Sequence, residues 1–134
     1  MVPEADLRQT DAGLVPASPG GFVLNARDAE DFLVLAGAGI LIVEGEERPL
    51  RPWDFVHCPA GTNHVIVGAG DGLCLLLAVG ARDRSIGPDW GAYTVDTAAI
   101  RRRAGVEHET TDPKEAYASF PKSRLGRYRE GWLS

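Results

Sequence analysis

The feature that most constrains this chain is a series of short β-forming segments separated by glycine and proline turns. Between residues 32 and 79, runs of apolar and β-branched residues recur at short, regular spacing. Runs of this length with turn residues between them indicate strands rather than helices. The expected strands cover residues 32–35, 40–43, 47–50, 54–58, 64–67 and 73–79, with a weaker strand at 21–25. Strands spaced in this way predict an antiparallel barrel or sandwich.

Two of these strands carry signals about their position in a sheet. Pro49 places the strand at 47–50 at a sheet edge or at the start of the strand, because proline cannot donate to a ladder. The unbroken apolarity of residues 73–79 predicts a strand that is buried on both faces. Residues 32–35 and 40–43 flank a glycine turn, so we expect them to pair as a hairpin.

Helical signals appear only after residue 80. Asp96 is a good N-cap for a short helix over residues 97–104, which Gly105 would end. Thr111 or Asp112 would cap a second helix that begins at Pro113 and continues to residue 119. We therefore expect an all-β fold with a short helical C-terminal extension.

Length and composition agree with a single domain. The chain has 134 residues, 44% of them hydrophobic and 25% charged, which is ordinary for a globular domain. Its 16 glycines and 9 prolines favour a turn-rich β-protein over a helical bundle. We expect residues 1–134 to form one domain, with the barrel core at about 21–80 and the loop and helix extension at 81–134.

Charge and cysteine content bear on partners and location. The net charge is −5, which disfavours nucleic acid and anionic membranes as partners. The longest basic run, Arg101–Arg103, is interpreted as an exposed helix face. No apolar stretch is long enough to span a membrane, and the polar, acidic first residues lack a signal peptide, so we expect a cytoplasmic protein. In that compartment Cys58 and Cys74 are expected to be free thiols.

The most specific pattern lies in residues 53–64, WDFVHCPAGTNH. It resembles the second cupin motif, in which glycine is followed by five residues, proline, any residue, glycine, two residues and histidine. Pro59, Gly61 and His64 fit this spacing, and Trp53 stands where the motif usually has its first glycine.

The first cupin motif is present only in part. It runs His-x-His, three or four residues, glutamate, six residues and glycine, and its second half resembles Glu30 followed by Gly37. The longer spacing puts Val23 and Asn25 at the two histidine positions, and the shorter spacing puts Leu24 and Ala26 there. Neither spacing supplies a histidine.

The resemblance implies a cupin-type jelly-roll β-barrel with a ligand pocket in its mouth. Cupins commonly hold one divalent ion, such as iron, manganese, nickel or zinc, on three histidines and one glutamate. The two metal-ligand candidates carried over by position are His64 and Glu30. Residues expected at the pocket are His64, Glu30, His57, Phe32 and Phe55, with Ile42 as a further lining residue.

The functional expectation is a small, homodimeric cupin that binds a small molecule in the barrel mouth, with a divalent metal in the intact family pattern. Cupin reactions include dioxygenation, isomerisation and decarboxylation, and the fold alone does not choose between them. The alternative is a metal-free, non-catalytic cupin that acts as a binding or dimerisation module. His57 and Cys58 are strand neighbours that face opposite sides, so we do not expect them to share a zinc site with His64.

The segment before Glu30 is short for a cupin barrel, which needs two or three strands there. We hypothesise that a segment between about residue 27 and Glu30 is missing, together with the histidine half of the first motif. An intact mass of 14.4 kDa would exclude a gap in the sequence. With the chain as printed, the barrel would be open or completed by a strand of a partner chain.

Overall fold

The structure is a computed structural model that describes residues 24–26, 28–69, 74–80, 90–119, 130, 131 and 133, with residues 24–26 described by their backbone alone. Its described elements are the strands β1 (Leu24–Ala26), β2 (Glu30–Ala36), β3 (Ala38–Val43), β4 (Glu46–Leu50), β5 (Phe55–Cys58), β6 (Asn63–Ala69), β7 (Leu75–Gly80) and β8 (Gly91–Tyr93), and the helices α2 (Thr97–Arg101) and α3 (Pro113–Ala116). Among the described residues no helix is long and apolar enough to cross a membrane.

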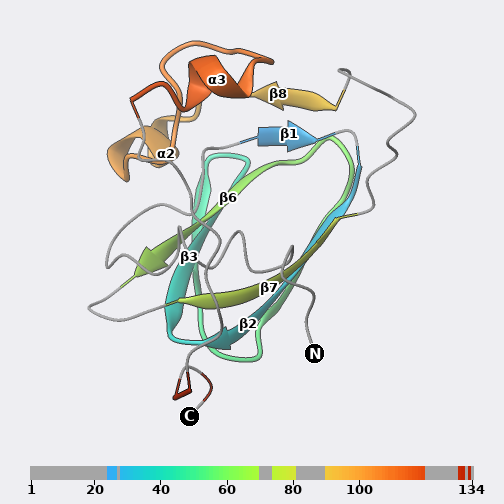
Figure 1. The fold of residues 1–134 in the computed structure, drawn as a ribbon, viewed down its shortest axis with the longest axis vertical. Helices are drawn as coiled ribbons and strands as arrows, with labels where there is room; N and C mark the ends of the chain where they lie inside the picture. The colour runs from blue at the N-terminus through green and yellow to red at the C-terminus, as the bar shows by residue number, and fades with distance from the viewer. Residues whose placement is uncertain are drawn as a thin grey trace.

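The strands form two antiparallel sheets. The larger sheet has the order β4-β3-β6-β1-β8, and the smaller sheet has the order β5-β2-β7. Figure 1 shows β2 and β7 running side by side, with β8 next to β1 at the end of the molecule that also carries α2 and α3. The all-β expectation is confirmed, and Pro49 lies on the edge strand β4, as predicted.

The expected hairpin between the second and third strands is wrong. β2 belongs to the smaller sheet and β3 to the larger one, so the chain changes sheets at Gly37. Gly37 has a φ of 80°, which glycine adopts without a steric penalty, and the register of β2 shifts between Val34 and Ala36. Bends of this kind let a strand turn the corner between two packed sheets.

The inner faces of the two sheets enclose one hydrophobic core. Alternate residues of each strand point inward, because successive side chains of a strand lie on opposite faces. The larger sheet contributes Leu41, Leu50 and Ile66, and the smaller sheet contributes Phe32, Val34 and Cys58. Burying these side chains supplies most of the free energy that holds the sheets together.

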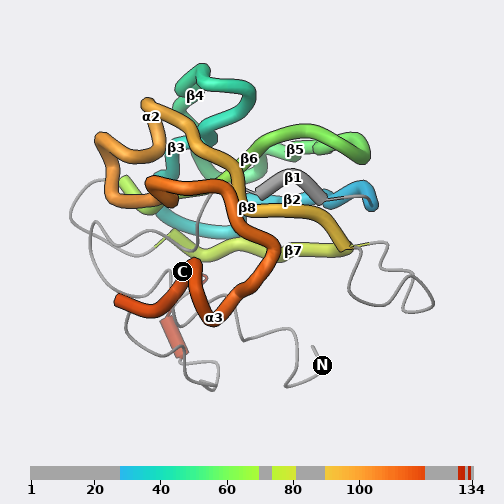
Figure 2. The backbone as a smooth tube through the Cα atoms, turned by 90° about the horizontal axis from the view of Figure 1, so that it is seen from above, coloured from blue at the N-terminus to red at the C-terminus, as the bar shows by residue number. Residues whose placement is uncertain are grey.

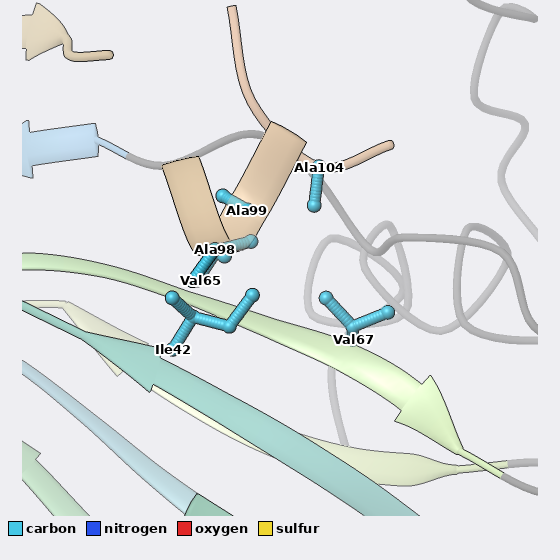
Figure 3. Close-up of a cluster of buried hydrophobic side chains, with 6 residues drawn as sticks. All are labelled: Ile42, Val65, Val67, Ala98, Ala99 and Ala104. Carbon is cyan, nitrogen blue, oxygen red and sulfur yellow. The ribbon is translucent and has the colours of Figure 1, made fainter. Parts of the chain in front are cut away.

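The outer face of the larger sheet is covered by the segment that contains α2. Figure 3 shows the alanines of this segment facing the valine and isoleucine side chains of β3 and β6. The members of this outer cluster are Ile42, Val65, Val67, Ala98, Ala99 and Ala104. Small alanine side chains let the helix approach the sheet closely, so the cluster is well buried despite the shortness of α2.

α2 begins where the sequence predicts and ends three residues earlier. The Asp96 side chain accepts a hydrogen bond from the Ala99 amide, so Asp96 is the N-cap. The helix stops because Arg103 adopts a left-handed φ of 59° and the amide of Ala104 bonds to the carbonyl of Ala99. This arrangement is a Schellman motif, with arginine in the position that glycine usually takes.

Arg102 is an exception to the expected solvent-exposed basic run. Its guanidinium donates two hydrogen bonds of 2.8 Å to the carboxylate of Glu47, and this contact lowers the pKa of Glu47. Glu47 belongs to β4, and Figure 2 shows α2 beside that strand. The pair therefore ties α2 to the edge of the larger sheet.

The second helix is also shorter than expected. α3 is capped by Asp112, which accepts a hydrogen bond from the Lys114 amide, and it has Pro113 at its start. It ends at Ala116, and Tyr117 packs edge-on against Tyr93 of β8. Strand β8 was not expected, because residues 91–93 form a strand only by pairing with β1.

The outer face of the smaller sheet carries an exposed apolar side chain on each of its two edge strands, β5 and β7. β7 was expected to be buried on both faces, but it is an edge strand and Val79 is 58% exposed. Phe55 of β5 is 64% exposed. Unbroken apolarity indicates a strand but does not tell whether another layer covers it. Leu73, the first residue of the expected strand, lies outside the described residues, as do residues 21–23.

Candidate functional site

A polar pair crosses the interior between the two sheets. Glu30 is the first residue of β2 in the smaller sheet, and His64 is the second residue of β6 in the larger sheet. Both lie on the inner faces of their strands: His64 is opposite Val43 in the register, and Glu30 is opposite Cys58. Their side chains meet with His64 Nε2 2.8 Å from Glu30 Oε2.

Both ring nitrogens of His64 have oxygen partners. Nδ1 donates to the carbonyl oxygen of Thr62 at 2.8 Å. A carbonyl oxygen can only accept, so Nδ1 carries a proton. Nε2 faces a carboxylate oxygen, which suits a second N–H on the ring and therefore the imidazolium form. Phe32 lies edge-on to the imidazole, with 5.7 Å between ring centroids, and closes this side of the site.

The two side chains of the pair differ in solvent exposure, and the environment of His64 shifts its pKa. The side chain of His64 is 3% exposed and that of Glu30 is 15% exposed. Among the described residues, His64 is the one buried polar or charged side chain. Burial lowers the pKa of His64, but the hydrogen bonds to Glu30 and Thr62 and the nearby carboxylates outweigh burial and raise it.

Cys58 lies beside this pair as a neutral thiol. It faces Glu30 across the β2–β5 ladder and is fully buried. Burial, together with the charges of Glu30 and Asp31, raises the pKa of the Cys58 thiol to about 11. A thiol in this state is neither a ready nucleophile nor a ready metal ligand. Cys58 and Cys74 are both free, as expected.

The remaining residues expected at the pocket lie elsewhere. His57 and Phe55 are on the outward face of β5, where His57 Nδ1 lies 2.5 Å from the carboxylate of Asp31. Ile42 points to the opposite side of the larger sheet, under α2. The structure thus brings together Glu30, Phe32 and His64, and it places His57, Phe55 and Ile42 apart from them. The alternation that separates His57 from Cys58 was foreseen and holds.

Thr62 is the part of this site that the motifs did not indicate. Its contribution is a backbone carbonyl, which carries no residue-type signal. It is positioned by a turn in which the Thr62 amide bonds to the carbonyl of Pro59. The proline and glycine of the motif therefore shape the turn that orients His64.

The described donors do not fit a divalent metal site. Across the described residues, no three histidine, cysteine, aspartate or glutamate side chains gather as a metal-binding group. The register places Leu24 directly opposite His64, which corresponds to the shorter spacing of the first motif. Leucine has no ligating atom, and the next residue on that face of the strand is Ala26. Glu30 and His64 alone are two ligands, and a site for this class of metal needs three or four.

The glycine positions of the two motifs share one backbone conformation. Gly37 and Gly61 have φ values of 80° and 78°. Trp53, which stands at the first glycine position of the second motif, has a φ of 74°, and its amide donates to the Val34 carbonyl at 2.7 Å. The turn geometry of the motif is therefore retained where its usual residue is not.

Comparison with known families agrees with this geometry. Residues 18–80 match the family model described as a cupin domain. The chain carries a cupin domain. The cupin fold expected from the motifs is confirmed, and the two half-motifs lie in the part of the chain that matches. No curated protein matches the sequence.

Several solved structures are similar to the cupin domain. One is a sugar phosphate isomerase from a cupin superfamily of Silicibacter pomeroyi, 28% identical with a TM-score of 0.48 over 51% of this chain and 45% of that chain. A second is a predicted oxalate decarboxylase of Thermotoga maritima, 26% identical with a TM-score of 0.46 over 48% and 56%. A third is the polyketide cyclase RemF of Streptomyces resistomycificus, 20% identical with a TM-score of 0.44 over 51% and 49%. The chain spans about half the length of these structures.

Proposed function

We propose that this cupin domain binds a small molecule at the Glu30–His64 pair, through a hydroxyl group of the ligand. The observation that carries the proposal is the burial of His64, the one buried polar or charged side chain among the residues that the structure describes, directly against a carboxylate. Burying a charged group costs free energy, so a buried ion pair is a candidate functional site. Glu30 is the more exposed member and is the side from which a ligand would approach.

A hydroxyl suits this pair because it can donate and accept at the same time. Inserted between the two side chains, it would accept from His64 Nε2 and donate to Glu30 Oε2. Each buried group would then keep a hydrogen-bond partner, so the exchange would leave none unsatisfied. The ligand class is a small hydroxyl-bearing molecule, such as a hydroxy acid or a polyol.

The test is a thermal-shift and NMR titration with a panel of small hydroxy acids and polyols. We expect at least one compound to raise the melting temperature saturably and to move the His64 ring signals. His64→Gln should abolish that response, whereas His57→Gln, a matched change on the exposed face of β5, should leave it intact. A response that survives His64→Gln, or no response to any compound, would contradict the proposal.

A second candidate role is dimerisation through the outer face of the smaller sheet. Three large apolar side chains are exposed there or at its edge: Trp53 is 73% exposed, Phe55 64% and Val79 58%. The outer face of the larger sheet is covered by α2, whereas Phe55 and Val79 are exposed on the outer face of the smaller sheet. Exposed apolar patches commonly mark interaction sites, and a second copy of the chain offers the same patch in return.

Light scattering after size exclusion tests this second role. We expect a dimer, and we expect Phe55→Asp combined with Val79→Lys to give a folded monomer. Thr97→Asp, a charge added at an exposed site of the covered side, is the control and should leave the dimer unchanged. A wild-type monomer at all concentrations would rule out the dimer.

A further inference from the structure

We propose that Glu30 and His64 form a direct, metal-independent clasp between the two sheets, in the place where a cupin would otherwise hold an ion. The clasp describes the ligand-free domain, because a hydroxyl bound as proposed above would lie between the two side chains. The inference rests on how the donor atoms of the pair are used, on the register of β1, and on the difference between this pair and a similar pair on the surface.

The donor atoms of His64 are already committed. Nδ1 donates to the carbonyl of Thr62 and Nε2 points at Glu30 Oε2, each at 2.8 Å. A metal would have to take the lone pair of Nε2, which requires that nitrogen to lose its proton and its hydrogen bond. The Thr62 contact keeps Nδ1 protonated, so Nε2 is the ring nitrogen that a metal would have to take.

The neighbouring strand offers no replacement ligand. β1 is hydrogen-bonded to β6, and its residue opposite His64 is Leu24. Residues two apart lie on the same face of a strand, so the second position on this face is Ala26. Neither residue type can bind a metal. Of the side chains in the described part of the chain, an ion entering here would meet one imidazole and one carboxylate, a pair that would hold it weakly.

The clasp joins elements that have no backbone pairing with each other. β2 and β6 lie in different sheets, so the hydrogen bond between Glu30 and His64 is a cross-sheet link. A metal ion bound by side chains of both sheets would make the same kind of link. The direct hydrogen bond can replace such a metal link because the two side chains lie 2.8 Å apart.

Asp31 and His57 provide a matched comparison within the same molecule. Asp31 follows Glu30 on β2, and His57 lies opposite it on β5, so an acid again faces a histidine, but these side chains are 40% and 55% exposed. Exposed pairs contribute little to stability, whereas breaking a buried pair leaves an uncompensated charge. The stability losses from substituting Glu30 and His64 should therefore be strongly non-additive, whereas those from substituting Asp31 and His57 should add.

A double-mutant cycle tests the coupling. We expect Glu30→Gln or His64→Gln to lower the melting temperature by roughly 10 °C, and the double variant to lose little more than either single variant. The cycle with Asp31→Asn and His57→Gln should give shifts of about 3 °C or less that add. Additive losses at Glu30 and His64 would overturn the clasp.

Metal content and NMR test the wild-type protein directly, even if a variant at position 30 or 64 fails to fold. Protein loaded with Fe²⁺, Mn²⁺, Ni²⁺ or Zn²⁺ in turn and then desalted should retain far less than one ion per chain, and its melting temperature should not respond to EDTA. Long-range ¹H–¹⁵N spectra should show both ring nitrogens of His64 protonated. One ion per chain that His64→Gln removes, or an unprotonated Nε2, would overturn metal independence. Neither result would bear on ligand binding, which the titration with hydroxy acids and polyols measures separately.

Discussion

Both hydrogen bonds of His64 end on oxygen atoms that accept, which makes its charged form the stable one in the folded protein. The pKa of His64 is raised above its ordinary value of 6.5 despite burial. A group whose pKa is raised by folding stabilises the folded state fully below its unfolded pKa. That stabilisation is lost as the pH rises through the folded pKa.

The unfolding free energy should therefore fall as the pH rises from about 6.5 upward through the pKa of folded His64. Urea denaturation at a series of pH values across this range measures the change. In His64→Gln the fall should be absent from the same range, because glutamine does not titrate. A wild-type stability that is flat or rises there would show that the pair is not held as an ion pair.

Trp53 combines a large side chain with a backbone conformation that favours glycine. A non-glycine residue in the left-handed region is strained by about 1–2 kcal/mol, and Trp53 holds a φ of 74° with an exposed side chain. Its exposure means that little burial compensates for the strain. Strained residues that persist commonly serve a function, and a surface for a second copy of the chain would be one such function.

Trp53→Gly should stabilise the monomeric domain by about 0.5–1 kcal/mol, because glycine adopts this φ without a steric penalty but loses more backbone entropy on folding. The free energy of unfolding from urea titration checks it. Trp53→Ala removes the same side chain and keeps the strain, so it is the control. Trp53→Gly should be the more stable of the two, and the opposite order would contradict the interpretation.

At the scale of elements, much of the strand pattern follows from local sequence, and the pairing does not. The apolar runs bounded by glycine mark β2, β3 and β6 because turn residues stop each strand. The hairpin expected at Gly37 is wrong, since a glycine turn looks the same whether the chain folds back or changes sheets. β8 was missed because only its partner β1 makes those residues a strand.

The candidate site, too, could be predicted from the sequence only in part. Glu30 and His64 could be predicted as partners, because each occupies a position in a spaced motif. His57 and Phe55 could not be placed from spacing, because their direction depends on which face of β5 meets the other sheet. The carbonyl of Thr62 carries no sequence signal at all. Sequence therefore indicates which side chains can meet, and the register decides which do.

The register of β1 predicts where two histidine ligands could be introduced. If Leu24 and Ala26 occupy the two histidine positions of the first motif, Leu24→His combined with Ala26→His should create a site for a divalent ion. We expect Ni²⁺ or Zn²⁺ to raise the melting temperature of this variant and not that of the wild type. The control is Asn25→His, on the opposite face of β1, and an equal response there would refute the assigned register.

The cap of α2 makes a second prediction at this scale. Asp96→Ala should destabilise the protein by about 1 kcal/mol, because the Ala99 amide loses its acceptor. Chemical denaturation measures the loss. Asp96→Asn retains an acceptor and should restore most of the stability, whereas an equal loss in both variants would point away from capping.

At the scale of the whole molecule, the C-terminal segment acts as a third layer on one side. Its alanines bury the outer face of the larger sheet, and the Arg102–Glu47 pair anchors it to β4. The matched cupin region ends at residue 80, so this layer comes from beyond it. The two outer faces are therefore different surfaces.

Ala99→Asp should detach this layer, because Ala99 is fully buried and an unpaired charge there is costly. We expect faster proteolysis within residues 95–119 and a loss of about 2–4 kcal/mol. Thr97→Asp, an exposed substitution in the same helix, is the control. Equal protease resistance in both variants would show that the layer is not held by this contact.

The order of strands in the smaller sheet has a consequence for synthesis of the chain. Glu30 pairs both with Cys58 and with Gly80, so neither neighbour of β2 is local in sequence. The β3–β4 hairpin closes across two residues and can form early, because local contacts require less loop closure. On the ribosome, β2 can pair with β5 once Cys58 has emerged, but its other edge stays unpaired until Gly80 has left the exit tunnel. A pause in translation before that point would expose this strand to aggregation.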